Sequence, residues 1–445
     1  MVLHALAGLK LRFYGGVNEV GGNKIMVEYG RERILLDFGV SFGRKRMFYS
    51  EPFLSPRTVE SLVEFGLLPE VEGLYRFEEG EAELSAVFLS HAHMDHSAYI
   101  SFLKREIPVY CGETVATILR AVGELRGKSL EYDFSGLRFE TFRTGMKIRV
   151  GCFEVEPVHV DHSIPGAYGF LVHSPGGSIA YTGDFRLHGS RPQLTWDFIS
   201  KVSEAKIEAF IVEGTNLVDG EVSSEGELMN KLQKIGSKVK GLILADFAST
   251  DVDRLKSFLF MAAKTKRRLA IDFRHAYMVE KLSTDRRLKL PSLKDSRLTI
   301  YRKAKKRYMP WERRLMDEYE TVAAEDVASR QSEYVLALSF YGFGELLEIK
   351  PPPGSCYILS SSEPVGEEAE IDYWRMVNWL EHYGLPQYHI HISGHIMPLQ
   401  LLEVLETVKP RLVFPIHCER PTLFKKFLEG SFKVEIPKVQ ETYEV

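Results

Sequence analysis

The segment Ser90–Ser97, which reads SHAHMDHS, constrains this chain more than any other, because it holds three histidines and one aspartate within six residues. The four residues before it are apolar and predict a buried strand, so the segment forms the loop at that strand's carboxyl end. In such a loop His91 and His93 direct their rings to one side, while Asp95 and His96 face a second point nearby. The chain has 14 histidines in 445 residues, so chance clustering is improbable, and the loop predicts a site for two metal ions rather than a merely polar turn.

The pattern HxHxDH is the signature of the metallo-β-lactamase superfamily, and the other motifs of that superfamily occur in the correct order along the chain, each after an apolar run. The chain therefore resembles this superfamily. The matching residues are Asp37 in ILLDFG, His162 in VDHSIPG, Asp184 in YTGDF and His417 in FPIHCE. The resemblance implies that Asp37 orients the histidine loop without binding metal.

The same resemblance implies a set of metal ligands. One ion is bound by His91, His93 and His162, the other by Asp95, His96 and His417, and Asp184 bridges the two. All of these donors are nitrogen or oxygen, which suits Zn²⁺ and, nearly as well, Mn²⁺. Two such ions lower the pKa of a bound water and clamp a phosphate. We therefore expect two divalent ions per chain, with Asp95 and Asp184 essential to catalysis.

Two further motifs narrow the resemblance to the β-CASP subgroup and, within it, to RNase J-like nucleases. Glu213 in IVEGTN resembles the acidic motif of the subgroup, and we expect it to support a ligand by hydrogen bonding. The segment HISGH closely resembles the corresponding segment of RNase J-like enzymes. The resemblance implies that His395 is the cation or general acid of the reaction. It also implies a phosphate-binding pocket made of His391, Ser393, Gly394 and His395.

The order of apolar segments predicts an α/β fold, namely the metallo-β-lactamase αββα sandwich with an inserted β-CASP domain. We assign residues 1–214 to the first part of the core and 386–445 to its second part. Between them, residues 215–385 alternate strands with helices, which predicts a parallel sheet covered by helices. Strands at Tyr388–Ser393 and Leu412–Ile416 are expected to return to the core and to deliver the late histidines.

The net charge of −4 conceals a basic segment. Residues 264–313 contain 17 Lys or Arg and 5 Asp or Glu, a balance of +12, so the rest of the chain carries −16. The densest part, Arg302–Arg307, is flanked by Tyr301 and Tyr308. Such cations attract a phosphate backbone, and the tyrosines can stack on bases. The alternative is a solvated helix face.

No apolar stretch approaches the length of a membrane span, and no signal peptide is evident, so we expect a cytoplasmic protein that does not bind membranes. The four cysteines are widely spaced and are expected to be free thiols.

Taken with the resemblance, these features predict a two-metal phosphodiesterase acting on nucleic acid, RNA more than DNA, as a 5′-to-3′ exoribonuclease. The alternatives are an endonuclease of the mRNA 3′-end processing or DNA-repair type, a small-molecule metallohydrolase, and a binding subunit without activity. Three features favour a nuclease, namely the large insertion, the HISGH segment and the basic segment. Because every metal-ligand position is filled, a binding subunit without activity is disfavoured. The sequence leaves open whether the protein forms a homodimer.

Overall fold

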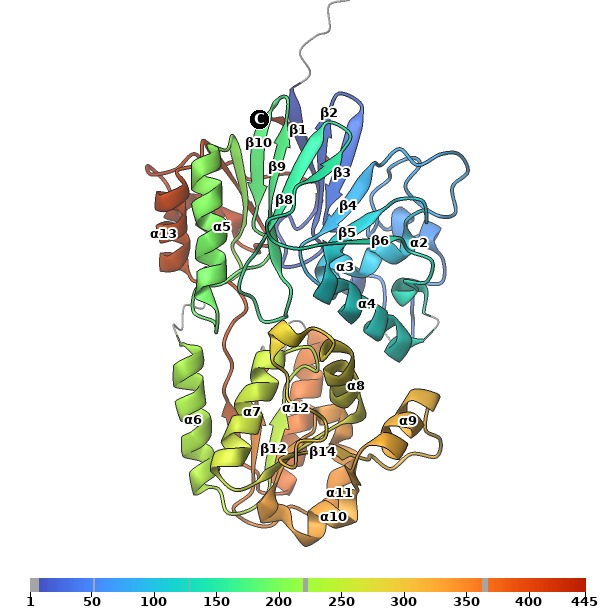
Figure 1. The fold of residues 1–445 in the computed structure, drawn as a ribbon, viewed down its shortest axis with the longest axis vertical. Helices are drawn as coiled ribbons and strands as arrows, with labels where there is room; N and C mark the ends of the chain where they lie inside the picture. Colours follow the sequence, from blue (N-terminus) through green and yellow to red (C-terminus); the bar gives the residue numbers. More distant parts are fainter. Residues whose placement is uncertain (1–7, 51–52, 128, 219–222, 362–366) are drawn as a thin grey trace, which may run out of the picture. The chain divides into compact units, whose positions relative to one another are not determined.

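The computed structural model describes residues 8–50, 53–127, 129–218, 223–361 and 367–445 (Figure 1). The chain divides into two compact units, one formed by Met1–Val222 with Gly394–Val445, the other by Ser223–Ser393. The boundaries expected from the sequence, after residues 214 and 385, each fall eight residues earlier than these.

The first unit contains two sheets. One has the strand order β20-β1-β2-β3-β4-β5-β6 and the other β19-β11-β10-β9-β8-β7. The strands of the first sheet are β1 (Leu9–Gly15), β2 (Lys24–Tyr29), β3 (Glu32–Leu36), β4 (Ala86–Leu89), β5 (Val109–Gly112), β6 (Phe139–Phe142) and β20 (Thr442–Glu444). Those of the second are β7 (Ile148–Val150), β8 (Phe153–His159), β9 (Tyr168–Ser174), β10 (Gly177–Tyr181), β11 (Ala209–Glu213) and β19 (Leu412–Ile416).

The two sheets bury one apolar core between them. Phe13 of β1 meets Phe414 of β19 with ring centroids 5.2 Å apart, and Phe88 of β4 meets Phe170 of β9 at 5.9 Å. Outside the second sheet, α5 (Pro192–Ala205) and α13 (Pro398–Val408) cover a second core cluster, while α4 (Glu113–Arg126) packs on β5 and β6. This layering is the αββα sandwich that the sequence predicted, so the fold-class prediction is confirmed.

Several strands of the sandwich end where the sequence motifs begin. β3 runs parallel to β4, and β10, β11 and β19 run parallel to one another. Asp37 follows β3 directly, and the histidine loop follows β4. Glu213 is the last residue of β11, and His417 comes directly after β19. The sheets therefore carry each motif at the carboxyl end of a strand, where α/β proteins place their chemistry.

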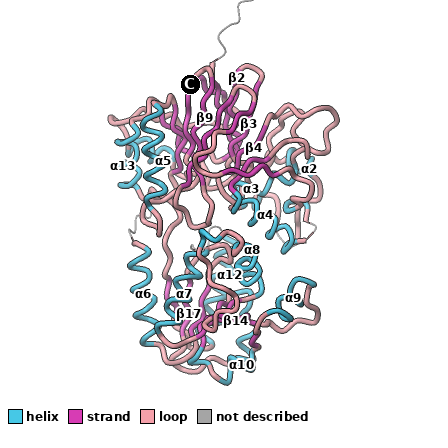
Figure 2. The backbone as a smooth tube through the Cα atoms, viewed as in Figure 1, coloured by secondary structure: helices cyan, strands magenta, loops and turns pink. Residues whose placement is uncertain are grey.

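The second unit is built on a parallel sheet with the order β15-β14-β13-β16-β12-β17-β18 (Figure 2). Its strands are β12 (Ile243–Asp246), β13 (Arg268–Ile271), β14 (Leu298–Tyr301), β15 (Thr321–Val322), β16 (Tyr334–Ala337), β17 (Cys356–Leu359) and β18 (Gln387–His389). Helix α7 (Val252–Lys264) packs on β13 and β16, and α6 (Glu225–Lys238) packs on α7. The other helices include α8 (Phe273–Leu282), α9 (Pro310–Glu318), α10 (Ala324–Ser329), α11 (Leu346–Ile349) and α12 (Glu367–His382), the last three contributing to a core cluster with the sheet.

One expected strand is wrong in both extent and place. The segment Tyr388–Ser393 was expected to be a strand of the first unit. The strand observed there is β18, which ends at His389 and pairs in parallel with β17 of the second unit. The residues from Ile390 to Ser393 are irregular. Within the described part of the chain, no helix combines the length and the apolar character needed to cross a membrane.

Candidate metal centre and basic segment

The histidine loop is held against two neighbouring loops by backbone contacts. Asn23 N–H donates to the carbonyl oxygen of Asp95 at 3.0 Å, and Phe38 N–H donates to that of His96 at 2.7 Å. Gly39 makes this approach possible, because a Cβ atom there would lie 1.7 Å from the Asp95 carbonyl oxygen. After β4, the loop forms a single helical turn, α3 (Met94–Ser97), which turns Asp95 and His96 inward.

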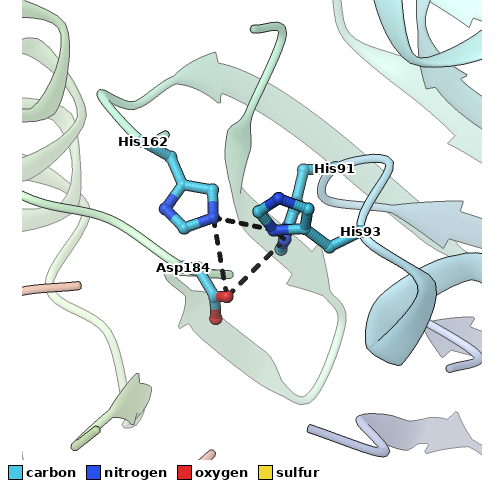
Figure 3. A group of neighbouring side chains, drawn as sticks. All are labelled: His91, His93, His162 and Asp184. Atoms are coloured by element: carbon cyan, nitrogen blue, oxygen red, sulfur yellow. Dashed lines mark hydrogen bonds and ion pairs between the residues drawn. The ribbon is translucent and has the colours of Figure 1, made fainter. Parts of the chain in front are cut away.

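The first donor group is His91, His93, His162 and Asp184 (Figure 3). His93 Nδ1 lies 3.1 Å from Nε2 of both His91 and His162. Asp184 Oδ2 lies 3.5 Å from His91 Nε2 and 3.7 Å from His162 Nε2. A tetrahedron with metal–ligand bonds of about 2.0–2.2 Å has edges of about 3.3–3.6 Å, so these separations suit one ion.

The second donor group is Asp95, His96 and His417. His417 Nε2 lies 3.1 Å from Asp95 Oδ2, and His96 Nε2 lies 3.9 Å from the same oxygen. The oxygen of Asp184 that faces the first group also lies 3.2 Å from His96 Nε2 and 3.7 Å from His417 Nε2. Asp184 Oδ2 thus belongs to both groups, as a bridging carboxylate would.

Four ligand histidines have their Nδ1 atoms occupied, which leaves Nε2 free to bind metal. His96 donates to Asp37 at 2.7 Å, and His162 donates to the Gly394 carbonyl at 2.7 Å. The other two donate to hydroxyl oxygens, His91 to Ser90 at 3.0 Å and His417 to Thr215 at 2.9 Å. These assignments follow because each hydroxyl donates its own O–H to a carboxylate, Ser90 to Asp37 and Thr215 to Glu213, and so accepts from the histidine.

The charges of the centre also suit cations. Burial is the largest cause that lowers the pKa of His91, His93 and His162, to about 4 for His93, so these imidazoles are neutral and their nitrogens can donate electron pairs. Asp184 is 1% exposed, yet its Oδ1 has no hydrogen-bond partner among the described residues. A buried carboxylate oxygen without a donor is costly unless a cation neutralises it. The residues present therefore fit a pair of divalent ions.

His395 lies beside the two donor groups. Its Nδ1 is 3.0 Å from Glu213 Oε2 and 3.7 Å from Asp184 Oδ2. Burial lowers the pKa of His395, but the charges of Glu213 and Asp184 outweigh this and raise it to about 9. Glu213 is fully buried, and its Oε1 accepts from the backbone N–H of Phe185 and Ile396. Glu213 thus ties His395 to the loop that carries Asp184.

The four residues of the expected phosphate pocket are divided between the units. Gly394 and His395 belong to the first unit, and the Gly394 carbonyl accepts from His162. His391 and Ser393 belong to the second unit, where the His391 ring stacks on His389 with centroids 6.3 Å apart. The pocket itself stays a prediction.

Three polar residues at the centre were missed by the sequence reasoning. Tyr181 donates its hydroxyl to Asp37 Oδ2 at 2.5 Å. The hydroxyl of Thr215 lies between His417 and Glu213 and hydrogen-bonds to both. Asn23 Nδ2 lies 3.2 Å from the ring nitrogens of His96. Tyr181 and Thr215 each lie within three residues of a motif acid in the sequence, which was the available signal. Asn23 follows the Gly21–Gly22 turn and gave no comparable signal.

The basic segment lies in the second unit, and one of its expected features is wrong. Tyr301 was expected to stack on bases, but it is 1% exposed and donates its hydroxyl to Glu345 at 2.6 Å. It ends β14 and is part of the core, because its position in the strand faces the packed helices. Among the cations, Lys305 is paired with Glu312, whereas Lys306 and Arg307 are exposed and have no ion-pair partner in the part of the chain that the structure describes.

Comparisons with known proteins agree with this arrangement. Residues 72–212 match the model of the beta-lactamase superfamily domain. Ribonuclease J of Mycoplasma genitalium is 25% identical over 423 residues, which cover 92% of this chain and 68% of the relative. Ribonuclease J of Mycolicibacterium smegmatis is 28% identical over 430 residues, which cover 93% of this chain and 69% of the relative. These matches confirm the resemblance that the sequence motifs predicted.

A solved structure matches the whole fold. The crystal structure of a protein of unknown function from Enterococcus faecalis V583 aligns with a TM-score of 0.79 and 24% identity, covering 99% of this chain and 100% of that chain. At this identity the likeness establishes a shared fold.

Proposed function

We propose that this member of the metallo-β-lactamase superfamily is a 5′-to-3′ exoribonuclease that hydrolyses RNA at a centre of two divalent metal ions. The observation that carries the proposal is the position of Asp184 Oδ2, which lies within 3.7 Å of Nε2 of His91, His96, His162 and His417. A carboxylate oxygen that is shared by two donor groups could hold two divalent ions close together.

The chain's own residues supply the acid of the proposed reaction. When bound, the two ions supply an activated water and neutralise charge on the phosphate. Although burial opposes it, the charges of Glu213 and Asp184 raise the pKa of His395 to about 9, which favours its protonated form. Its Nδ1 faces Glu213, and we assign to this side chain the donation of a proton to the leaving oxygen or the stabilisation of the phosphate's negative charge.

The donor set favours zinc, with manganese as the alternative. The two donor groups together contain five histidine nitrogens and two carboxylates, and no thiolate is among them. The short separations between donor atoms suit a tetrahedral ion better than calcium, which takes more oxygen ligands at longer distances.

RNA is the proposed substrate for two reasons. The relatives that match over nine-tenths of this chain are called ribonuclease J. The second unit also carries the basic segment, whose exposed cations suit a phosphate backbone. A small-molecule metallohydrolase would need neither this unit nor its charge. DNA differs from RNA at a 2′-hydroxyl, so a direct comparison of the two polymers is required.

The 5′-to-3′ direction rests on the HISGH segment. We propose that His391, Ser393, Gly394 and His395 bind the phosphate of a 5′-monophosphate end, so that cleavage proceeds from that end. A 5′-hydroxyl would lose the hydrogen bonds of this pocket, and a triphosphate would be crowded.

The test is to incubate metal-loaded protein with 5′-labelled RNA and DNA of equal sequence, and with a circular form of the RNA. We expect mononucleotide products from 5′-monophosphorylated RNA, slower cleavage of 5′-hydroxyl RNA, and an intact circle. Rapid cutting of the circle would instead identify an endonuclease. Hydrolysis of lactone or β-lactam substrates without cleavage of either polymer would overturn the proposal in favour of a small-molecule enzyme.

A further inference from the structure

We propose that Tyr341 and Lys303 form a site on the second unit where a base of single-stranded RNA stacks on the tyrosine ring and the adjoining phosphate contacts the lysine. This inference rests on the proposed function, because it names a further contact to the same substrate. In this inference Tyr341 takes the place of Tyr301, which is buried, as the aromatic side chain that acts together with the basic segment.

The two residues follow different strands of one parallel sheet. Tyr341 follows β16, and Lys303 follows β14, with β13 between these strands. Tyr341 lies in the short 3-10 helix Phe340–Glu345 and Lys303 in a loop, and both segments leave the carboxyl end of the sheet, the edge where open α/β sheets bind ligands. The two segments are in contact, because Lys303 Nζ donates to the carbonyl oxygen of Tyr341 at 3.2 Å.

The ring of Tyr341 is exposed and also held in place. It is 78% exposed. Its hydroxyl donates to Asp372 Oδ2 at 3.0 Å, and its ring lies 5.5 Å from that of Phe340, which is partly buried against the core. A ring fixed at both ends loses little conformational entropy when a base stacks on it.

The cations next to this ring are available for phosphates. Among the described residues, the ammonium group of Lys303 contacts a backbone carbonyl and has no ion-pair partner. Lys306 and Arg307 follow in the same loop, exposed and without an ion-pair partner among the described residues. An exposed ring beside a run of free cations is how proteins bind single-stranded nucleic acid with little sequence preference. The exposed ring does not suit a double helix, whose bases are already stacked on one another.

The experiment measures the binding of fluorescently labelled single-stranded RNA to the full chain by anisotropy. Asp184→Asn is included in every protein to prevent cleavage. A second RNA has the same backbone but abasic positions. We expect Tyr341→Ala to weaken binding of the first RNA by about 5- to 150-fold, the range for loss of one stacked base, and to leave the abasic RNA unaffected.

Matched variants separate stacking from other effects. Tyr341→Phe keeps the ring and loses the bond to Asp372, so it should retain most of the affinity. Phe260→Ala removes a partly exposed ring from α7 of the same unit and should change nothing. Lys303→Gln should weaken binding of both RNAs and reduce the salt slope by about one unit.

Equal affinity of Tyr341→Ala and its parent for the base-bearing RNA would overturn the inference. So would an equal loss on both RNAs, since that would mean that Tyr341 only supports its loop. If Tyr341→Ala weakens RNA binding as expected but the wild-type protein does not cleave RNA, the proposed function is contradicted and the Tyr341 site still stands. If the wild-type protein cleaves RNA but Tyr341→Ala does not change RNA binding, the proposed function stands and the Tyr341 site is contradicted.

Discussion

Nδ1 of His96 lies 2.7 Å from Oδ2 of Asp37, and this contact decides which nitrogen of the ring faces the metal centre. Asp37 accepts three more hydrogen bonds, from the backbone N–H and hydroxyl of Ser90 and from the hydroxyl of Tyr181. A carboxylate saturated with donors cannot turn, so the N–H of His96 stays on Nδ1 and Nε2 points to Asp184.

The first prediction concerns this contact. Asp37→Asn should lower metal affinity by about 10- to 100-fold, because an amide has one accepting oxygen and would direct an N–H₂ group at another donor. Asparagine is the right replacement, since residue 37 has φ of 58° and asparagine tolerates that conformation. Metal affinity is measured by competition with a chelator. Asp197→Asn on the surface is the control, and an unchanged affinity in Asp37→Asn would contradict the role assigned to Asp37.

The second prediction separates the two roles given to the HISGH segment. His395→Ala should lower single-turnover cleavage by about 10²- to 10⁴-fold while the protein retains its metal, because the variant lacks the proton donor. Ser393→Ala should reduce the preference for 5′-monophosphate ends more than it slows cleavage. Metal content is measured alongside the rates. Loss of metal from His395→Ala would mean that His395 is a ligand and not the acid.

The third prediction concerns the basic segment. Reversing Lys306 and Arg307 to Glu should weaken RNA binding and flatten its salt dependence, because fewer counterions are released. Lys305 should behave differently, because it is paired with Glu312, which also accepts from the backbone at the start of α9. Lys305→Ala should lower the thermal midpoint and leave the salt slope nearly unchanged. If the double reversal leaves affinity and slope intact, the segment is only a solvated surface.

The fourth prediction concerns Lys24, which is 1% exposed. Burial lowers its pKa from 10.5 to about 8, so between these values the unfolded chain binds more protons than the folded one. Stability should therefore rise with pH across that window, relative to a chain without the amine, by roughly 3 kcal/mol at most. Denaturant unfolding of wild type and Lys24→Met, below pH 8 and above pH 10.5, measures this. If the free energy of unfolding changes with pH in the same way in both proteins, the lowered pKa of Lys24 is contradicted.

The metal-site residues could be predicted because each is the polar residue that ends or follows an apolar strand, so its signal is local. The hydrogen bonds that support these residues could not be predicted, because they join residues that are far apart in the sequence. Asn23 and His96 are 73 positions apart, and Lys303 and Tyr341 are 38 apart. The same limit explains the error at Tyr388–Ser393, because a short apolar strand does not reveal which sheet it will pair with.

The fold of the sandwich was predictable for a related reason. Alternating apolar residues on successive strands specify two buried faces before any partner is known. Tyr301 shows where this reasoning fails. It stands beside a run of cations in the sequence, which favoured exposure, yet its place at the end of β14 buries it against the core of the second unit.

The most direct test of the account is a titration of chelator-treated protein with Zn²⁺ or Mn²⁺, in which hydrolysis of 5′-monophosphorylated RNA is followed as metal is added. The account predicts that activity returns as about two ions bind per chain, and that Asp184→Ala stays inactive at every metal concentration while remaining folded. Full activity in Asp184→Ala, or activity in the wild type without added metal, would contradict the two-metal centre built around Asp184.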